Sequence, residues 1–219
     1  MGKKNGKSYR LALSFRPLTQ LYDPLIRVFM PEGRFKSALI EEANIRPGDR
    51  VLDFGCGTAT LSIIAKRGHP DSDVTGVDVD EKVLDIARRK AARQGIGIRI
   101  DLYDGGRLPY GDGSFERVVS SLVMHHLAKG QKVKSLREIH RVLKPGGEIH
   151  IADFGPPRNP IMSMLSFILS LVEPISDNIK GMIPHHLESS GFVGVKEGRH
   201  FNTMFGTISL YSAKKPELG

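Results

Sequence analysis

A short apolar run that ends in a turn with two glycines constrains the fold of this chain more than any other segment. It reads Val51-Leu52-Asp53-Phe54-Gly55-Cys56-Gly57-Thr58, and we predict a buried strand before the turn and a helix over residues 58–66 after it. Glycine accepts backbone angles that other residues avoid, and it lets a ligand lie against the main chain. Asp53 stands just before the first glycine, where a carboxylate repels phosphate and attracts an ammonium or sulfonium group.

A dinucleotide-binding fold is the competing interpretation of this turn. Its fingerprint is G-x-G-x-x-G, and in this chain the third glycine position is occupied by Thr60. Glycine spacing alone leaves both interpretations open, so the later motifs have to decide between them.

Strand-like and helix-like segments alternate regularly through the middle of the chain. Runs at 74–78, 98–102, 117–121 and 148–153 indicate further strands, and the apolar positions between them have helical spacing, as at 83–91 and 131–143. Such alternation predicts a parallel sheet with helices on both faces. Residues 192–197 and 207–213 indicate an antiparallel hairpin at the sheet edge, joined by a long loop. The predicted fold class is α/β: a Rossmann-like, seven-stranded, mostly parallel sheet with helices on both faces and a C-terminal antiparallel hairpin.

The chain is expected to hold one main domain, residues 49–219, preceded by a helical segment, residues 1–48, that covers the site. That segment has predicted helices before Pro31 and over 33–44. Within the main domain, residues 156–183 are predicted to be an apolar lid insertion. Apolar side chains occur all round a helical wheel at 161–169, which indicates burial on several sides. We expect a lid over an apolar or amphipathic acceptor; core packing or a dimer contact is the alternative.

Composition excludes several kinds of site. The 219 residues contain a single cysteine, Cys56, which predicts no internal disulfide, no cysteine-based metal site and a reducing, cytoplasmic location. The formal net charge is +8, yet the basic residues are scattered and no basic patch is interleaved with aromatic residues, so nucleic acid is not an expected partner. The longest apolar run, 161–172, is too short to span a bilayer.

Further motifs follow the glycine turn in a fixed order. They are Gly76-Val77-Asp78, Asp104 with Leu108-Pro109-Tyr110, Gly113-Ser114-Phe115, His125-His126-Leu127 and Arg141-Val142-Leu143-Lys144-Pro145-Gly146-Gly147. With the turn, they resemble the class I S-adenosyl-L-methionine (SAM)-dependent methyltransferases, and most of all the methyltransferase type 11 branch with the ubiquinone/menaquinone C-methyltransferases. The resemblance covers residues 50–154 and implies SAM as cofactor. Ala59 departs from the pattern, because the family usually has a third glycine there.

The resemblance implies a cofactor site at the carboxyl ends of the strands, where open α/β sheets bind ligands. Asp53 is expected to supply negative charge near the cationic groups of SAM, and Gly55 and Gly57 to let SAM approach the backbone. Asp78 is expected to accept both ribose hydroxyls, and Asp104 the adenine amino group. The other members of the expected cofactor-binding set are Cys56, Val79 beside the adenine, Gly105 and Ser120.

Methyl transfer is an in-line displacement that needs alignment and exclusion of water, and some acceptors also need a base to take a proton. His125 and His126 follow the fourth predicted strand, so they are candidate catalytic residues, together with Asp153 at the end of the fifth. Packing of the next helix is the alternative role for the two histidines. His185 and His186 are further candidates to face the substrate. Adjacent histidines rarely bind one ion together, so no metal site is expected.

The predicted function is transfer of a methyl group from SAM to a small acceptor that is apolar or amphipathic, such as a quinol or phenol ring or a lipid amine. Two other classes stay open. An NAD(P)-dependent oxidoreductase is disfavoured by Thr60 and Asp53, and a catalytically silent SAM-binding partner protein needs the same motifs as the enzyme. The expected partners are a small-molecule acceptor and a peripheral membrane or lipid contact, and the expected state is a monomer or homodimer.

Overall fold

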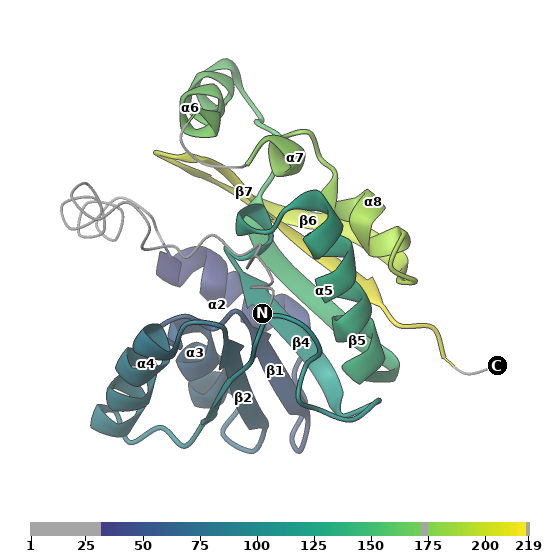
Figure 1. Cartoon of the computed structure of the whole chain (residues 1–219). Helices are drawn as coiled ribbons and strands as arrows, with labels where there is room; N and C mark the ends of the chain where they lie inside the picture. Colours follow the sequence, from purple (N-terminus) through teal and green to yellow (C-terminus); the bar gives the residue numbers. More distant parts are fainter. Residues whose placement is uncertain (1–31, 172–174, 218–219) are drawn as a thin grey trace, which may run out of the picture.

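The computed structural model describes residues 32–171 and 175–217, and in this part of the chain one sheet has the strand order β3-β2-β1-β4-β5-β7-β6 (Figure 1). The strands are β1 (Arg50–Phe54), β2 (Asp73–Asp78), β3 (Arg99–Leu102), β4 (Phe115–Ser121), β5 (Leu143–Phe154), β6 (Val193–Thr203) and β7 (Gly206–Lys214). Strands β1 to β5 pair in parallel, and β7 runs antiparallel to both of its neighbours. The predicted seven-stranded, mostly parallel sheet with a C-terminal antiparallel hairpin is confirmed.

The hairpin is tighter than predicted. Only Met204 and Phe205 separate β6 from β7, and the Thr203 hydroxyl closes the turn by donating to the Gly206 carbonyl over 2.8 Å. The predicted long loop is therefore wrong. Strand β6 lies at the sheet edge, is mostly exposed and polar, and carries register shifts between 193 and 196 and between 197 and 200. These irregularities hide the two-residue alternation that would have identified the strand.

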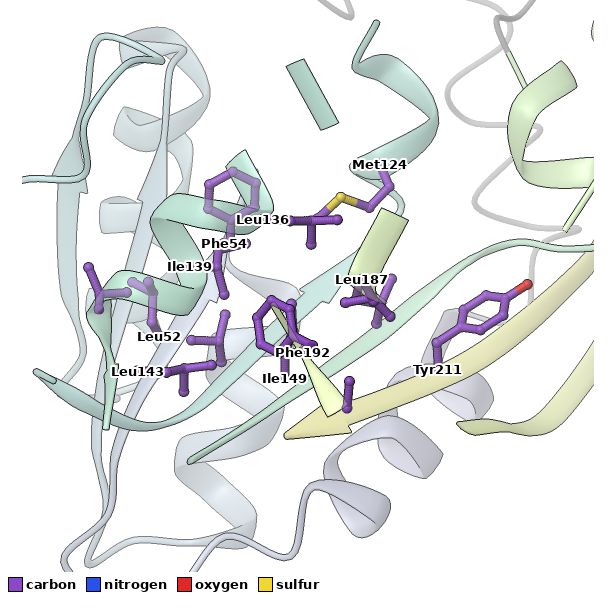
Figure 2. Close-up of a cluster of buried hydrophobic side chains, with 14 of the residues drawn as sticks. Leu52, Phe54, Met124, Leu136, Ile139, Leu143, Ile149, Leu187, Phe192 and Tyr211 are labelled. Atoms are coloured by element: carbon purple, nitrogen blue, oxygen red, sulfur yellow. The ribbon is translucent and has the colours of Figure 1, made fainter. Parts of the chain in front are cut away.

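Helices cover both faces of the sheet. Helices α2 (Glu32–Ala43) and α3 (Thr60–Gly68) contribute to one buried apolar cluster, and α5 (Lys129–Val142) and α8 (Ile183–Glu188) contribute to the other. Figure 2 shows the second cluster, in which Leu136 and Ile139 of α5 meet Leu187 of α8 and residues of β1 and β5. Helix α4 (Glu81–Arg93) packs against β2 and β3. These two layers fix the strand ends that carry the site.

Helix α3 begins at Thr60, two residues later than predicted. The preceding residue, Ala59, is fully buried and has a φ of 59°, in the left-handed region. An L-residue with a Cβ is strained in that region by roughly 1–2 kcal/mol, which glycine avoids. The glycine turn therefore extends through Ala59, and alanine occupies a backbone position that favours glycine.

Helix α6 (Pro160–Ser170) is the outermost part of the insertion and packs on β7 (Figure 1). Met162 and Ser166 are buried and Leu165 is half-buried, but five large apolar side chains are exposed: Ile161 64%, Met164 58%, Phe167 64%, Ile168 54% and the adjacent Leu171 71%. The predicted burial on several sides is wrong, because the helix uses one side for its contact with the sheet. The predicted helix before Pro31 lies outside the described residues.

Within residues 32–171 and 175–217, no helix is both long enough and apolar enough to cross a bilayer.

Replacing Ala59 with glycine is expected to raise the free energy of unfolding by about 0.5 kcal/mol. The relief of left-handed strain exceeds the loss of a buried methyl group and the added freedom of glycine in the unfolded chain. Urea unfolding measures the difference. Ala65→Gly is the matched control, because Ala65 is equally buried but lies inside α3, where glycine costs about 1 kcal/mol. Equal destabilisation of both variants would contradict the prediction.

Candidate functional site

A cleft of about 1090 Å³ lies at the carboxyl ends of β1, β2 and β4. The turn after β1, residues 78–80 after β2 and residues 121–123 after β4 line it, and α2 and α4 border it on two sides. The structure brings together these members of the predicted cofactor set: Gly55, Cys56, Gly57, Asp78 and Val79. The sheet therefore places the residues of two separate motifs in one site.

The glycine turn is fastened to β2 and open toward the cleft. The N–H groups of Gly55 and Cys56 both donate to the Val77 carbonyl, over 2.9 and 3.0 Å. A Cβ on Gly55 would lie 2.4 Å from a methyl group of Val123, so no side chain fits there. A Cβ on Gly57 would meet no atom within 4 Å. The backbone at Gly57 thus offers room for close approach of a ligand.

Asp78 has its carboxylate held by backbone N–H groups. Its Oδ2 accepts from Gly57 over 2.9 Å, and its Oδ1 accepts from Val79 over 2.7 Å and from Asp80 over 3.1 Å. These bonds orient the carboxylate at the end of β2, where it lines the cleft next to the glycine turn. The side chain is therefore fixed before any ligand binds.

Asp53 lies one layer beneath the cleft rather than on its lining. It is fully buried on β1, and its Oδ2 accepts from the Ser62 hydroxyl of α3 over 2.5 Å. Burial raises the pKa of Asp53 to about 6, although the Ser62 hydrogen bond and the positive charge of Lys36 oppose the rise. Lys36, which the sequence reasoning missed, lines the cleft from α2.

Asp104 and Gly105 lie outside the lining of the cleft. Asp104 is exposed, and its Oδ1 accepts from Gly106 over 2.8 Å, so it closes its own loop. The residue that faces the cleft from this segment is Tyr103, directly after β3, whose ring packs against Phe54 with centroids 6.0 Å apart. The sequence feature that could have identified Tyr103 is its position, one residue beyond the end of the strand.

Two adjacent serines at the end of β4 have opposite orientations. The predicted cofactor residue Ser120 is buried and donates to the Phe54 carbonyl over 2.9 Å, tying β4 to β1. Ser121 lines the cleft, and its buried hydroxyl has no hydrogen-bond partner among the described residues. Strand alternation explains the difference. Ser121 is therefore the serine that presents an unsatisfied polar atom to a ligand.

The two predicted histidines lie on η1 (Met124–His126), and Asp153 joins them from the end of β5. His125 Nδ1 and Asp153 Oδ1 are 2.8 Å apart, and both residues are buried. The rings of His125 and His126 face each other with centroids 3.9 Å apart. His126 lines the cleft, so the predicted catalytic residues form one connected group that reaches the cleft through His126.

Electrostatics set the protonation states of this group. Burial works to raise the pKa of Asp153, but His125 and the N–H of Phe154 outweigh it and hold that pKa below its ordinary value. Burial and the neighbouring His125 lower the pKa of His126 to about 4. At neutral pH, His126 is therefore an uncharged imidazole beside a buried carboxylate.

His185 and His186 do not line the cleft. His186 is buried on α8, and its Nε2 lies 2.9 Å from Asp177 Oδ2. In the part of the chain that the structure describes, no three His, Cys, Asp or Glu side chains are grouped so as to hold a metal ion.

Comparison with known proteins points to one family. Residues 51–147 match a family described as a methyltransferase domain. The demethylmenaquinone methyltransferase of Lactobacillus johnsonii is 35% identical over 136 residues, which are 61% of this chain and 55% of that protein. The one from Thermus thermophilus is 33% identical over 65% of each chain. The ubiquinone/menaquinone biosynthesis C-methyltransferase UbiE of Cupriavidus metallidurans is 26% identical over 95% of this chain and 93% of its own.

Solved structures share the fold. The YcgJ protein of Bacillus superposes with a TM-score of 0.68 at 18% identity, covering 84% of this chain and all of that one. The SAM-dependent methyltransferase SibL superposes with a TM-score of 0.76 at 20% identity, covering 97% of this chain and 64% of its own. With the glycine turn, the oriented Asp78 and the sheet order, these findings identify residues 51–147 as a methyltransferase domain similar to that of the ubiquinone/menaquinone C-methyltransferases, for which S-adenosyl-L-methionine is the expected cofactor.

Proposed function

We propose that this protein transfers the methyl group of SAM to a small acceptor that is apolar or amphipathic, with a quinol ring as the first candidate. The observation that carries the proposal is that one cleft contains both a part suited to the cofactor and a part suited to the acceptor. The open backbone at Gly57 and the oriented Asp78 suit the cofactor, and the uncharged His126 suits the acceptor. The curated relatives named as demethylmenaquinone methyltransferases support a quinone-type acceptor.

The cofactor-binding roles follow from the geometry of the cleft. Asp78 suits the two ribose hydroxyls because its carboxylate is held by backbone N–H groups, and Val79 suits the adenine face. Gly55, Cys56 and Gly57 leave the main chain accessible, and the unsatisfied hydroxyl of Ser121 suits a polar group of the cofactor. When bound, SAM supplies a methyl group on a cationic sulfur, and that sulfur is an uncharged thioether in the product, S-adenosylhomocysteine (SAH).

Asp53 is proposed to act on the cofactor through its charge and not through contact. A buried carboxylate is felt over a longer distance than an exposed one, because the low dielectric of the interior screens it weakly. Ser120 is proposed to hold the strand ends together. Asp104 and Gly105 are proposed to shape the loop beside Tyr103.

Proton removal is assigned to the histidine group. His126 lies on the cleft and is uncharged at neutral pH, so it can accept a proton from an acceptor hydroxyl as the methyl group moves. The adjacent His125–Asp153 pair places a negative charge next to the imidazolium that would form. Asp153 and His125 thus support His126, which is proposed as the group that meets the acceptor.

The segments around the cleft are proposed to cover it. Residues 1–48 are assigned this role because Glu32 and Lys36 of α2 already line the cleft. Residues 156–183 are assigned to the acceptor side, where α6 presents Phe167, Ile168 and neighbouring apolar side chains to an acceptor tail or a lipid surface. A cytoplasmic enzyme that acts as a monomer or homodimer, without nucleic acid, fits this scheme. The oxidoreductase alternative is dropped in favour of the methyltransferase, and a silent SAM-binding protein would bind SAM without turnover.

Asp78→Asn is expected to weaken SAM binding at least tenfold, because a carboxylate that accepts two hydroxyl protons is replaced by a group that accepts at one atom only. Calorimetric titration with SAM and SAH measures the change. Asp73→Asn, at the opposite end of β2, is the matched control. Unchanged affinity in the Asp78 variant, with the fold intact by circular dichroism, would remove Asp78 from the cofactor site.

Asp53→Asn is expected to make the protein more stable at pH 8 by up to about 3 kcal/mol. The pKa of Asp53 is about 6 when folded and 3.8 in its ordinary environment, so between these values the folded state binds more protons than the unfolded state. Stability therefore falls as the pH rises through this window. Asparagine does not titrate, so the Asp53→Asn variant lacks this decrease. Urea unfolding at pH 5 and pH 8 measures it.

The same variant separates charge from structure at the cofactor site. SAM carries one more positive charge than SAH, so loss of the Asp53 charge is expected to lower the affinity for SAM several-fold more than the affinity for SAH. An identical loss of affinity for both ligands, or an unchanged pH dependence of stability, would contradict the electrostatic role.

Phe167→Ser combined with Ile168→Ser is expected to weaken binding of a prenylated naphthoquinol several-fold and to leave SAM affinity and melting temperature unchanged. Both side chains are more than half exposed, so they contribute little to the folded core. Val193→Ser, an exposed apolar residue at the start of β6, is the control. A fall in melting temperature with normal acceptor binding would assign α6 to packing instead.

A further inference from the structure

A lysine is buried beneath the histidine group. Lys132 of α5 is 2% exposed, and its Nζ donates to Asn178 Oδ1 over 2.8 Å and lies 3.4 Å from Asp177 Oδ2. Removing an ammonium group from water costs several kcal/mol, so it needs partners with suitable geometry. Both partners come from the four-residue helix α7 (Ser176–Ile179), within the insertion that carries α6.

Asn178 connects this lysine to the site. It is fully buried, and its Nδ2 donates to Asp153 Oδ1 over 3.0 Å while its Oδ1 accepts from Lys132. The chemistry of the neighbours fixes the orientation of the amide, since an ammonium only donates and an ionised carboxylate only accepts. Asn178 therefore transmits the influence of Lys132 to the carboxylate that holds His125.

Asp153 completes the connection to the cleft. Its Oδ1 also accepts from His125 Nδ1 and from the N–H of Phe154, and its Oδ2 accepts from the N–H of Met124 over 2.7 Å. The resulting chain runs from Lys132 through Asn178, Asp153 and His125 to His126 at the cleft. Each step is a hydrogen bond except the last, which is a ring contact.

Stability alone does not explain this arrangement. Buried ion pairs and polar networks are often no more stabilising than apolar side chains of the same volume. Leu136 and Ile139, on the same helix as Lys132, belong to a buried apolar cluster. Lys132 is a buried cation that is connected through hydrogen bonds to the candidate catalytic residues, which points to a role in setting the charge and orientation of those residues.

We propose that Lys132 and Asn178 are positioning residues for methyl transfer: they set the charge and orientation of the Asp153–His125 pair, and through it those of His126. This inference rests on the proposed function. Through α7, it also ties the insertion that carries α6 to the proton-accepting end of the cleft. The burial of Lys132 lowers its pKa, and the negative charges of its partner Asp177 and of the more distant Asp153 oppose this decrease.

The charged and titratable groups of this network and of the adjoining cleft define what the test has to separate. They are His125 on η1, Asp153 on β5, Lys132 on α5, Asp177 on α7 with His186 of α8 bonded to it, and the Glu32–Lys36 ion pair of α2 at the cleft. Removing the positive charge of Lys132 leaves the negative charge of Asp153 less compensated. A proton on His126 is then favoured at higher pH.

Lys132→Met keeps the length of the side chain and removes its charge and hydrogen bonds. We expect the titration midpoint of the His126 imidazole, followed by NMR in the SAH-bound protein, to rise by about one pH unit from its position near 4. With a short-chain demethylated naphthoquinol as probe, kcat is expected to fall about tenfold, with its acid limb at higher pH and with KM and the Kd for SAM within twofold of wild type.

Two further variants keep the test decisive. Lys134→Met, an exposed lysine on the same helix, is the matched control and is expected to behave as wild type. Asn178→Leu breaks the connection but leaves Lys132 next to Asp177, so it serves if Lys132→Met fails to fold. A wild-type His126 midpoint in the folded variants, with only a lower melting temperature, would overturn the proposal. The NMR titration needs no acceptor, so a failure of wild type to methylate the naphthoquinol would count against the proposed function and not against the positioning role.

Discussion

Asp153 is an ionised carboxylate that is buried away from water, and its need for hydrogen bonds determines how the candidate catalytic residues are arranged. A carboxylate without access to water has to receive its hydrogen bonds from the protein itself. The donors come from the end of β5, from η1 and from α7, in the form of Phe154 N–H, His125 Nδ1 and Asn178 Nδ2. Segments distant in the sequence are thereby fixed to one another, and only in that arrangement does His126 reach the cleft.

The structure beneath and around the cleft contains several features that lower stability. Asp53 is buried with a raised pKa, Lys132 is a buried cation, and Ala59 and Leu122 have φ values of 59° in the left-handed region. Strain and buried charge of this kind persist where the surrounding structure outweighs them. Here two apolar clusters, one on each face of the sheet, supply the compensating stability, and Figure 2 shows one of them. The chain therefore holds its site at the junction of two rigid layers, away from its exposed edge.

Sequence reasoning succeeded where the signal is local. The glycine turn, the alternation of strands and helices, and acids at strand ends are short-range patterns, and Gly57, Asp78 and His126, which these patterns pointed to, all line the cleft. It named Ser120 rather than Ser121, which lines the cleft, because a strand buried on both faces shows no polar alternation that would tell the two serines apart. The Lys132–Asn178 bond joins residues 46 apart through a short helix, and no periodicity reports such a contact. The exposure of α6 depended on its neighbours, and its composition alone suggested burial.

The insertion after β5 has an apolar outer part and a polar inner part, and the two are held with different strength. Withdrawing α7 would leave Lys132 and Asp153 without their partner Asn178, at a cost of several kcal/mol against a typical domain stability of roughly 5–15 kcal/mol. Helix α6 is attached through one side to β7 and exposes the rest of its apolar surface. Moving α6 to fit an acceptor therefore requires little free energy, whereas moving α7 requires much more. Under the proposed function, α7 would therefore be the fixed anchor of the site, and an apolar acceptor would enter on the α6 side.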